Sequence, residues 1–219
     1  MQARKITMEA AKLEYVKAVG GATGCLNNLA TLQKAGKEEA LEKMEIAALQ
    51  EVSTIAKGEF KRYPQVDLFN EQFKPDSRLL RRKTLVIEGP SWVGKSEFAK
   101  AMMPDNEMLE VNCSNCDDEP PLGAYDATVH NGIVMDEMSA IVMVKNKKLF
   151  QAGPKRIDMS LSKTNCHSYR TFVWRKKIVV CSNKWMRQVK KLKKDDRKWI
   201  QKNTIYLKVA DKMFHDIEL

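Results

Sequence analysis

The segment EGPSWVGKSEF, residues 88–98, has a spacing of residues that can bind phosphate. Gly89 and Gly94 are separated by four residues, and Lys95 and Ser96 follow directly. In such a loop the glycines let backbone N–H groups turn toward phosphate oxygens, the lysine reaches the β- and γ-phosphates, and the hydroxyl binds Mg²⁺. The sequence therefore predicts an ATP and Mg²⁺ site at Gly89, Pro90, Ser91, Trp92, Val93, Gly94, Lys95 and Ser96. Within it, Trp92 is expected to cover the base or to pack, not to catalyse.

Two further apolar runs end in polar residues that suit the same chemistry. The run GIVM leads into Asp136 and Glu137, and IVVCS leads into Asn183. Asp136 is expected to hold Mg²⁺ with Ser96, and Glu137 to polarise an attacking water. A polar residue after a strand usually marks only a turn. The series of three strand ends is what predicts a nucleotide-hydrolysing site, with Asn183 reading the γ-phosphate or the water.

The elements that must position these residues can be predicted from the same runs. Strands are expected at 84–90, 108–113, 131–137 and 176–183, with a helix opening in GKSEFAKAMM. Strands that alternate with helical or loop segments predict an α/β fold with a mostly parallel sheet and helices on both faces. We assign this ATPase domain to residues 75–219.

Residues 1–74 are expected to form a separate helical domain that packs or oligomerises. Within 36–57 an apolar stripe recurs at helical spacing. It consists of Leu41, Met44, Ala48, Leu49, Val52 and Ile55. The composition changes at the basic, turn-rich segment KPDSRLLRRK, residues 74–83, which marks the boundary.

The charge balance indicates a polyanionic partner. Thirty-eight Lys and Arg residues against 28 Asp and Glu give a formal charge of +10, which favours nucleic acid over a membrane surface. No run of 18 apolar residues and no apolar signal region is found, so no membrane span or export is expected. Five cysteines in such a chain indicate reduced thiols and an intracellular location.

The order and spacing of these motifs resemble superfamily 3 helicases, and more closely the ATPase domain of replication-initiator (Rep) proteins of circular single-stranded DNA viruses. GPSWVGKS resembles their Walker A motif, IVMDEM their Walker B motif and IVVCSN their motif C. LFQAGPKRIDMSLSKTNCHSYRTFVW, residues 149–174, resembles their B′ segment, which carries a DNA-contacting hairpin. The resemblance covers roughly residues 60–205.

This resemblance implies an AAA+-like phosphate-loop NTPase that acts as an ATP-dependent helicase or translocase in the replication of a viral or virus-derived element. It implies a homo-oligomer, a hexameric ring, on single-stranded DNA in a host nucleus. Arg156 and Lys163 would touch DNA phosphates. An arginine from the neighbouring subunit would complete the ATP site, and Arg197 is favoured over Arg187 for this role.

Two departures from the family are visible. Walker B reads Asp-Glu where viral relatives often have Asp-Asp, which keeps both roles. The initiators' nuclease needs a His-x-His pair and a tyrosine with a lysine three residues on, whereas His130, His167 and His215 lie far apart and Tyr15 is followed by Lys17. We therefore expect a helicase half without its endonuclease.

Several alternatives remain open on the sequence. The chain can be an inactive descendant that binds nucleic acid or partner subunits, an RNA helicase, or, less in keeping with Asn183, a small-molecule kinase. The basic tract 187–202 fits a solvated helix face and a nucleic-acid footprint equally well. Cys113, Cys116, Cys166 and His167 could be combined into a zinc site, but unligated thiols are favoured because adjacent ligands at 166 and 167 have poor geometry.

Overall fold

A computed structural model describes residues 36, 37, 40, 41, 43, 44, 60–103, 107–160 and 168–215. The chain divides into two compact units, Met1–Val52 and Ser53–Leu219. The six described residues of the first unit are helical, and Leu41 and Met44 are 63% and 69% exposed. The other apolar stripe residues lie outside the described part. Residues 60–74, which the sequence analysis placed in the helical domain, belong to the second unit.

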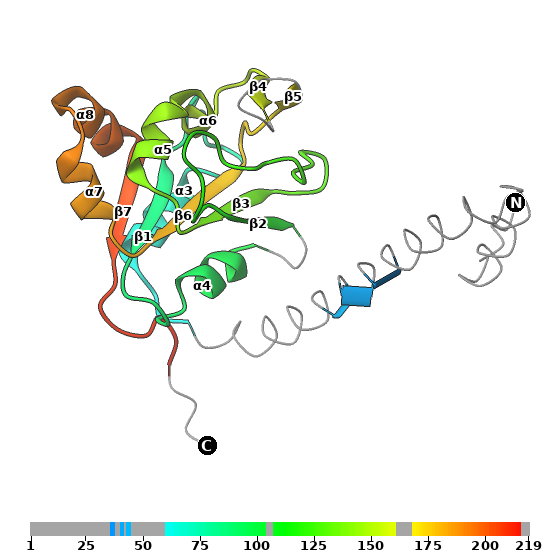
Figure 1. Ribbon diagram of the computed structural model, residues 1–219. Coiled ribbons are helices and arrows are strands. Elements are labelled where there is room, and N and C mark those ends of the chain that lie inside the picture. Colours follow the sequence, from blue (N-terminus) through cyan, green and yellow to red (C-terminus); the bar gives the residue numbers. More distant parts are fainter. Residues whose placement is uncertain are drawn as a thin grey trace, which may run out of the picture. The chain divides into compact units, whose positions relative to one another are not determined.

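The second unit is built on a five-stranded sheet (Figure 1). Its strands are β1 (Thr84–Glu88), β2 (Met108–Asn112), β3 (Gly132–Asp136), β6 (Lys177–Ser182) and β7 (Thr204–Lys208). Their order is β2-β3-β6-β1-β7, and every neighbouring pair is parallel. The four strands expected from the sequence are confirmed. The fifth, β7, was not predicted.

Both faces of this sheet are buried, which explains the continuous apolar runs. Leu85, Val86 and Ile87 in β1 are fully buried, as are Ile133, Val134 and Met135 in β3. Alternate residues enter different clusters, because successive side chains of a strand point to opposite faces. Leu85 and Ile87 belong to one cluster, whereas Val86 belongs to the other.

Helices cover each face. The first cluster includes residues of α3 (Pro64–Glu71) and α4 (Lys95–Ala101). The second includes residues of α5 (Ala140–Lys145), α6 (Lys147–Gln151), α7 (Trp185–Lys191) and α8 (Lys194–Asn203). The expected arrangement of helices on both faces is confirmed. Among the described residues, no helix has both the length and the apolar character needed to cross a membrane.

The B′-like segment contains a separate antiparallel hairpin. Strands β4 (Ile157–Ser160) and β5 (Ser168–Thr171) pair with Ile157 opposite Thr171. Arg170 Nε lies 3.0 Å from Asp158 Oδ1 across the pair. Residues 161–167, between the two strands in the sequence, lie outside the described residues.

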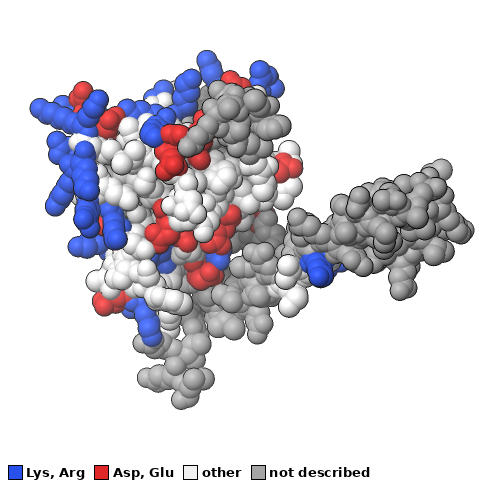
Figure 2. Space-filling view, in the orientation of Figure 1, with Lys and Arg blue, Asp and Glu red and all other residues white. Residues whose placement is uncertain are grey.

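Charged side chains are unevenly distributed over the visible face of the molecule. Figure 2 shows Lys and Arg side chains gathered over the flank formed by α7 and α8, at the left of Figure 1. Acidic side chains gather toward the middle of the same view. The net positive charge is therefore concentrated, and not spread evenly over this face.

Candidate nucleotide site

The parallel sheet brings the three predicted motifs to one edge. The carboxyl ends of parallel strands meet at the same edge of a sheet, where ligands bind in open α/β folds. β1 leads into the loop 89–96, β3 ends at Asp136, and β6 leads into Asn183. Because β6 lies between β1 and β3, Asn183 stands between the loop and the two carboxylates.

Lys95 is the buried cation of this edge. Its side chain is buried, with 6% of the residue exposed, and its Nζ donates to three oxygens. These are the carbonyl oxygens of Gly89 (3.1 Å) and Pro90 (2.7 Å) and Oδ1 of Asn183 (2.8 Å). All three acceptors are neutral, and no ion pair of Lys95 occurs among the described residues. A buried ammonium without a counter-charge is unfavourable, so the site favours an anionic ligand.

Ser96 and Asp136 form the second contact of the site. Ser96 Oγ donates to Asp136 Oδ1 over 2.8 Å. A hydroxyl and a carboxylate oxygen are ligands that Mg²⁺ accepts, together with phosphate oxygens and water. The residues present therefore fit the expected metal, and the sequence prediction that pairs Ser96 with Asp136 agrees with their contact.

The amide of Asn183 links the loop to Glu137. Its Nδ2 donates to Glu137 Oε1 (2.6 Å) and to Ser91 Oγ (3.2 Å), while its Oδ1 accepts from Lys95. Glu137 has a φ of 54°, a left-handed conformation that costs a non-glycine residue about 1 kcal/mol or more. Strained residues of this kind cluster at functional sites. Here the strained residue carries the exposed carboxylate that accepts the hydrogen bond from Asn183.

Trp92 projects from the loop without packing. It is 96% exposed and has a φ of 68°, so it does not pack against the described residues of its own chain. The expectation that it covers a bound base stays a prediction. Gly94, by contrast, is favoured by its φ of 84°, and a Cβ there would also lie a tight 3.0 Å from the Phe214 ring.

A segment that follows β7 supports the loop from behind, and the sequence analysis did not identify it. Met213 N donates to Val93 O (2.9 Å), and Lys61 N donates to Met213 O (2.8 Å). A Cβ at Gly89 would lie 2.6 Å from Val209 Cγ2. No motif marks this support, because the contacting residues are more than a hundred positions apart.

Glu88, the last residue of β1, was also missed. Its Oε2 accepts from Met186 N (3.2 Å) and from the hydroxyl of Tyr206. One carboxylate therefore joins β1 to β7 and to the first turn of α7, the helix that begins two residues after Asn183. The available signal was a charged residue at the end of a buried strand.

The remaining predicted site residues lie outside this hydrogen-bonded set. Arg187 on α7, Arg197 on α8 and Arg156 before β4 are exposed, and Lys163 lies outside the described residues. Cys113 is buried, which raises the pKa of its thiol. No group of three His, Cys, Asp or Glu in the described part of the chain is placed to hold a metal. Cys166 and His167 lie outside that part.

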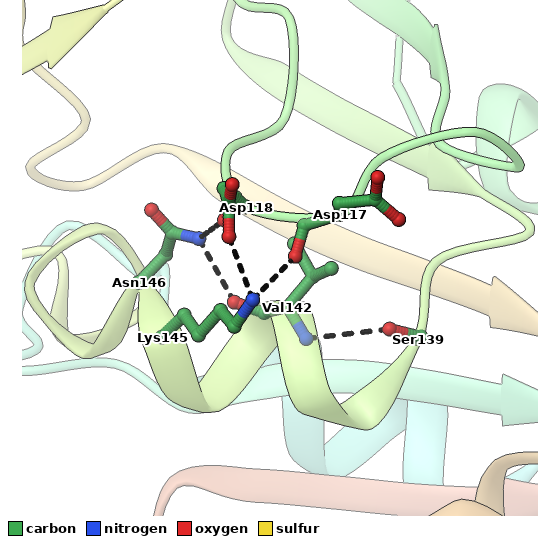
Figure 3. A network of polar contacts seen from close by, with 6 residues as sticks. All are labelled: Asp117, Asp118, Ser139, Val142, Lys145 and Asn146. Carbon is green, nitrogen blue, oxygen red and sulfur yellow. Dashed lines mark hydrogen bonds and ion pairs between the residues drawn. The ribbon is translucent and has the colours of Figure 1, made fainter. Parts of the chain in front are cut away.

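The loop after β2 is tied to the helix that follows Glu137 (Figure 3). Ser139 Oγ accepts from Val142 N (3.3 Å) and caps α5. From the last turn of α5, Lys145 Nζ contacts Asp118 Oδ1 (2.6 Å) and the carbonyl oxygen of Asp117 (2.8 Å). The Ser139 contact caps the start of α5, and the Lys145 contacts tie its last turn to the loop after β2.

No protein-family model matches the chain, and no curated protein matches its sequence. The chain is similar to the structure of NtrX from Brucella abortus in complex with ADP, with a TM-score of 0.40 and 12% identity over 84% of this chain and 45% of that chain. It is also similar to the S. cerevisiae Hsp104–ADP complex, with a TM-score of 0.40 and 12% identity over 68% of this chain and 32% of that chain.

This chain thus spans less than half of the NtrX chain and about a third of the Hsp104 chain. The sheet, the loop between β1 and α4, and the contact between Ser96 and Asp136 decide the fold class. The fold is that of a phosphate-loop NTPase. The expected α/β fold class is confirmed.

Proposed function

We propose that this protein is a Mg²⁺-dependent ATPase of superfamily 3 type that couples hydrolysis to movement along single-stranded nucleic acid. The observation that carries the proposal is the buried Lys95 ammonium. Its hydrogen-bond acceptors among the described residues are all neutral oxygens. The triphosphate of ATP supplies the missing negative charge. The motif order, and its resemblance to viral initiators, supports the motor and its role in replicating a viral or virus-derived element.

In the proposed mechanism the loop residues bind and neutralise the phosphates. Lys95 turns from the carbonyl oxygens of Gly89 and Pro90 to the β- and γ-phosphate oxygens. Ser96 and Asp136 hold Mg²⁺, which adds positive charge to the same oxygens when it is bound. The backbone N–H groups of the loop supply further donors.

Glu137 accepts the proton of the attacking water, and Asn183 controls its position. In the structure the Asn183 amide already contacts both Lys95 and Glu137. A γ-phosphate that draws Lys95 away leaves Asn183 Oδ1 free to orient the water. The same amide therefore senses the phosphate and holds the base.

The nucleic acid is proposed to contact the β4–β5 hairpin through Arg156 and Lys163. Single-stranded DNA is the first partner to test and RNA the second. Assembly into a homo-oligomeric ring and a location in the host nucleus belong to the same proposal.

The proposal is tested by phosphate release from ATP with and without Mg²⁺ and single-stranded DNA. We expect Lys95→Ala to lose nucleotide binding and turnover. Glu137→Gln should keep nucleotide binding and lose turnover by roughly 10²-fold or more. The control is Asp117→Asn, since Figure 3 shows that carboxylate pointing away from Lys145. Wild-type turnover in Lys95→Ala contradicts the site, and turnover that never responds to DNA or RNA contradicts the motor.

A further inference from the structure

A group of lysines on α7, α8 and their connection has no role in the nucleotide site. We call the group the basic ridge; it comprises Lys190, Lys191, Lys193, Lys194, Lys198 and Lys202. All six are exposed, and none forms an ion pair with a carboxylate among the described residues. In Figure 2 blue side chains gather over this flank, with some red and white atoms among them.

The way α7 and α8 pack forces these lysines outward. Trp185, Val189 and Ile200 are buried in the core, and they hold one side of each helix against the sheet. Asp196, one of the two acidic residues near the ridge, forms an ion pair with Lys147 on α6 over 2.7 Å. It is therefore already engaged and does not neutralise the ridge.

Helical spacing aligns three lysines on the outer side of α8. Lys194, Lys198 and Lys202 follow one another at intervals of four residues, so they lie on one side of the helix about 6 Å apart along its axis. Lys190 and Lys191 end α7 next to them, and Lys193 lies in the connection. The result is a row of positive charge along a rigid element.

The fold gains little from this row. Lysines in the last turn of a helix are favourable, which accounts for Lys190, Lys191 and Lys202. Lys193 and Lys194 stand at the beginning of α8, where the helix dipole disfavours positive charge. Like charges four residues apart also repel. A ridge with this arrangement is explained by an external polyanion.

The surroundings favour nucleic acid over a membrane as that polyanion. A helix that binds a lipid surface inserts an apolar face beside its basic one. The apolar residues Trp185, Val189 and Ile200 of α7 and α8 are buried in the core instead, and the ridge itself consists of lysines. Phosphate groups of a nucleic-acid backbone need only charge and donors.

We propose that the basic ridge is a binding surface for the phosphate backbone of single-stranded nucleic acid. This inference rests on the proposed nucleic-acid partner and gives that partner a contact surface separate from the β4–β5 hairpin. The ridge begins in the last turn of α7, the helix that follows Asn183, so a strand held there contacts an element that adjoins the nucleotide site. The ridge provides affinity without base specificity.

The test is fluorescence anisotropy with a labelled oligothymidylate over a range of salt concentrations. The variant is Lys194→Gln, Lys198→Gln and Lys202→Gln combined. The control is Arg78→Gln, Arg81→Gln and Lys83→Gln combined, three exposed residues before β1, because it makes the same change in net charge. Far-ultraviolet circular dichroism and DNA-free ATPase activity should be unchanged in both variants.

We expect the ridge variant to bind roughly tenfold more weakly or worse, and the slope of log affinity against log salt to fall by about 2, for three lost phosphate contacts. The control should retain nearly wild-type affinity and slope. Equal losses in the two variants, or an unchanged slope in the ridge variant, overturn the ridge while the nucleic-acid partner stands. No binding by the wild-type protein overturns the partner itself. A ridge variant that loses binding to anionic phosphatidylserine vesicles but keeps oligothymidylate binding overturns the assignment to nucleic acid.

Discussion

Asn183 is the residue on which the geometry of the site converges. Its amide forms hydrogen bonds with Lys95, Glu137 and Ser91 at once. A nucleotide that binds the loop and moves Lys95 would therefore also alter the contact of Asn183 with Glu137, the proposed base. In the proposed mechanism this side chain affects turnover more than binding, because the contacts proposed for it, to the attacking water and the γ-phosphate, matter most in the transition state.

We predict different losses for two substitutions at this position. Asn183→Ala should lower turnover roughly 10²-fold with a small change in ATP affinity. Asn183→Asp is nearly isosteric, but its charge pairs with Lys95 and repels both Glu137 and phosphate. It should therefore weaken nucleotide binding more than alanine does. Titration with a fluorescent ATP analogue and steady-state turnover separate the two effects, and equal affinities of the two variants contradict this account.

Trp92 presents the opposite case, a large side chain without internal contacts. Because it is 96% exposed, Trp92→Ala should change the free energy of unfolding by no more than about 0.5 kcal/mol. If the indole covers the bound base, the same variant weakens ATP binding and loses the change in tryptophan emission on nucleotide addition. Unchanged emission and affinity show that Trp92 faces something other than nucleotide.

At the scale of the elements, Glu88 holds three of them together. Its carboxylate accepts from Tyr206 on β7 and from Met186 N at the start of α7. Burial, and then the hydrogen bond to Glu88, raise the pKa of Tyr206 above its usual 10. A raised pKa in the folded state contributes stability below pH 10, and that contribution is lost as the pH rises through the folded-state pKa.

We therefore predict that Tyr206→Phe lowers the free energy of unfolding by about 1 kcal/mol at neutral pH, which is typical of one hydrogen bond. Above pH 10 the difference between variant and wild type should shrink, since the wild-type contribution disappears there. Urea unfolding at the two pH values measures both quantities. Tyr63→Phe is the comparison, because the pKa of Tyr63 is also raised by burial but no contact with Glu88 accompanies it. A difference that grows above pH 10 contradicts the assignment.

Much of the α/β unit could be predicted because apolar runs are local signals. The strands β1, β2, β3 and β6 and the loop 89–96 all follow from such runs. β7 was missed because TIYLK has only two buried residues, too few for a clear pattern. The insertion of β6 between β1 and β3, which brings Asn183 to Lys95, depends on sheet order and cannot be derived from the order of motifs. The support of the loop by Met213 joins residues distant in sequence, for which no local pattern exists.

At the scale of the whole molecule, the proposed phosphoryl transfer calls for more positive charge than the described residues of the site supply. Among the described residues, Lys95 is the one basic side chain in the hydrogen-bonded set of the loop, the acids and Asn183. Arg187 and Arg197 are exposed and make no side-chain ion pair in the described part. An exposed arginine on α8 is available to a neighbouring subunit, and that is the role we propose for Arg197.

This role makes a prediction about mixtures of variants. Arg197→Ala should bind nucleotide normally and lose turnover by about 10³-fold or more, which is the effect of an arginine supplied between subunits. Lys95→Ala is inactive because its own loop is damaged, yet its Arg197 is intact. In mixed assemblies that arginine faces an intact loop on an Arg197→Ala subunit, so mixing two inactive proteins should restore partial activity.

Arg187→Ala mixed in the same way tests the second candidate, and Arg78→Ala is the exposed control that should be active alone. Sedimentation in parallel must show that activity rises with assembly. Turnover that does not depend on protein concentration, in particles that sediment as monomers, would rule out a shared site.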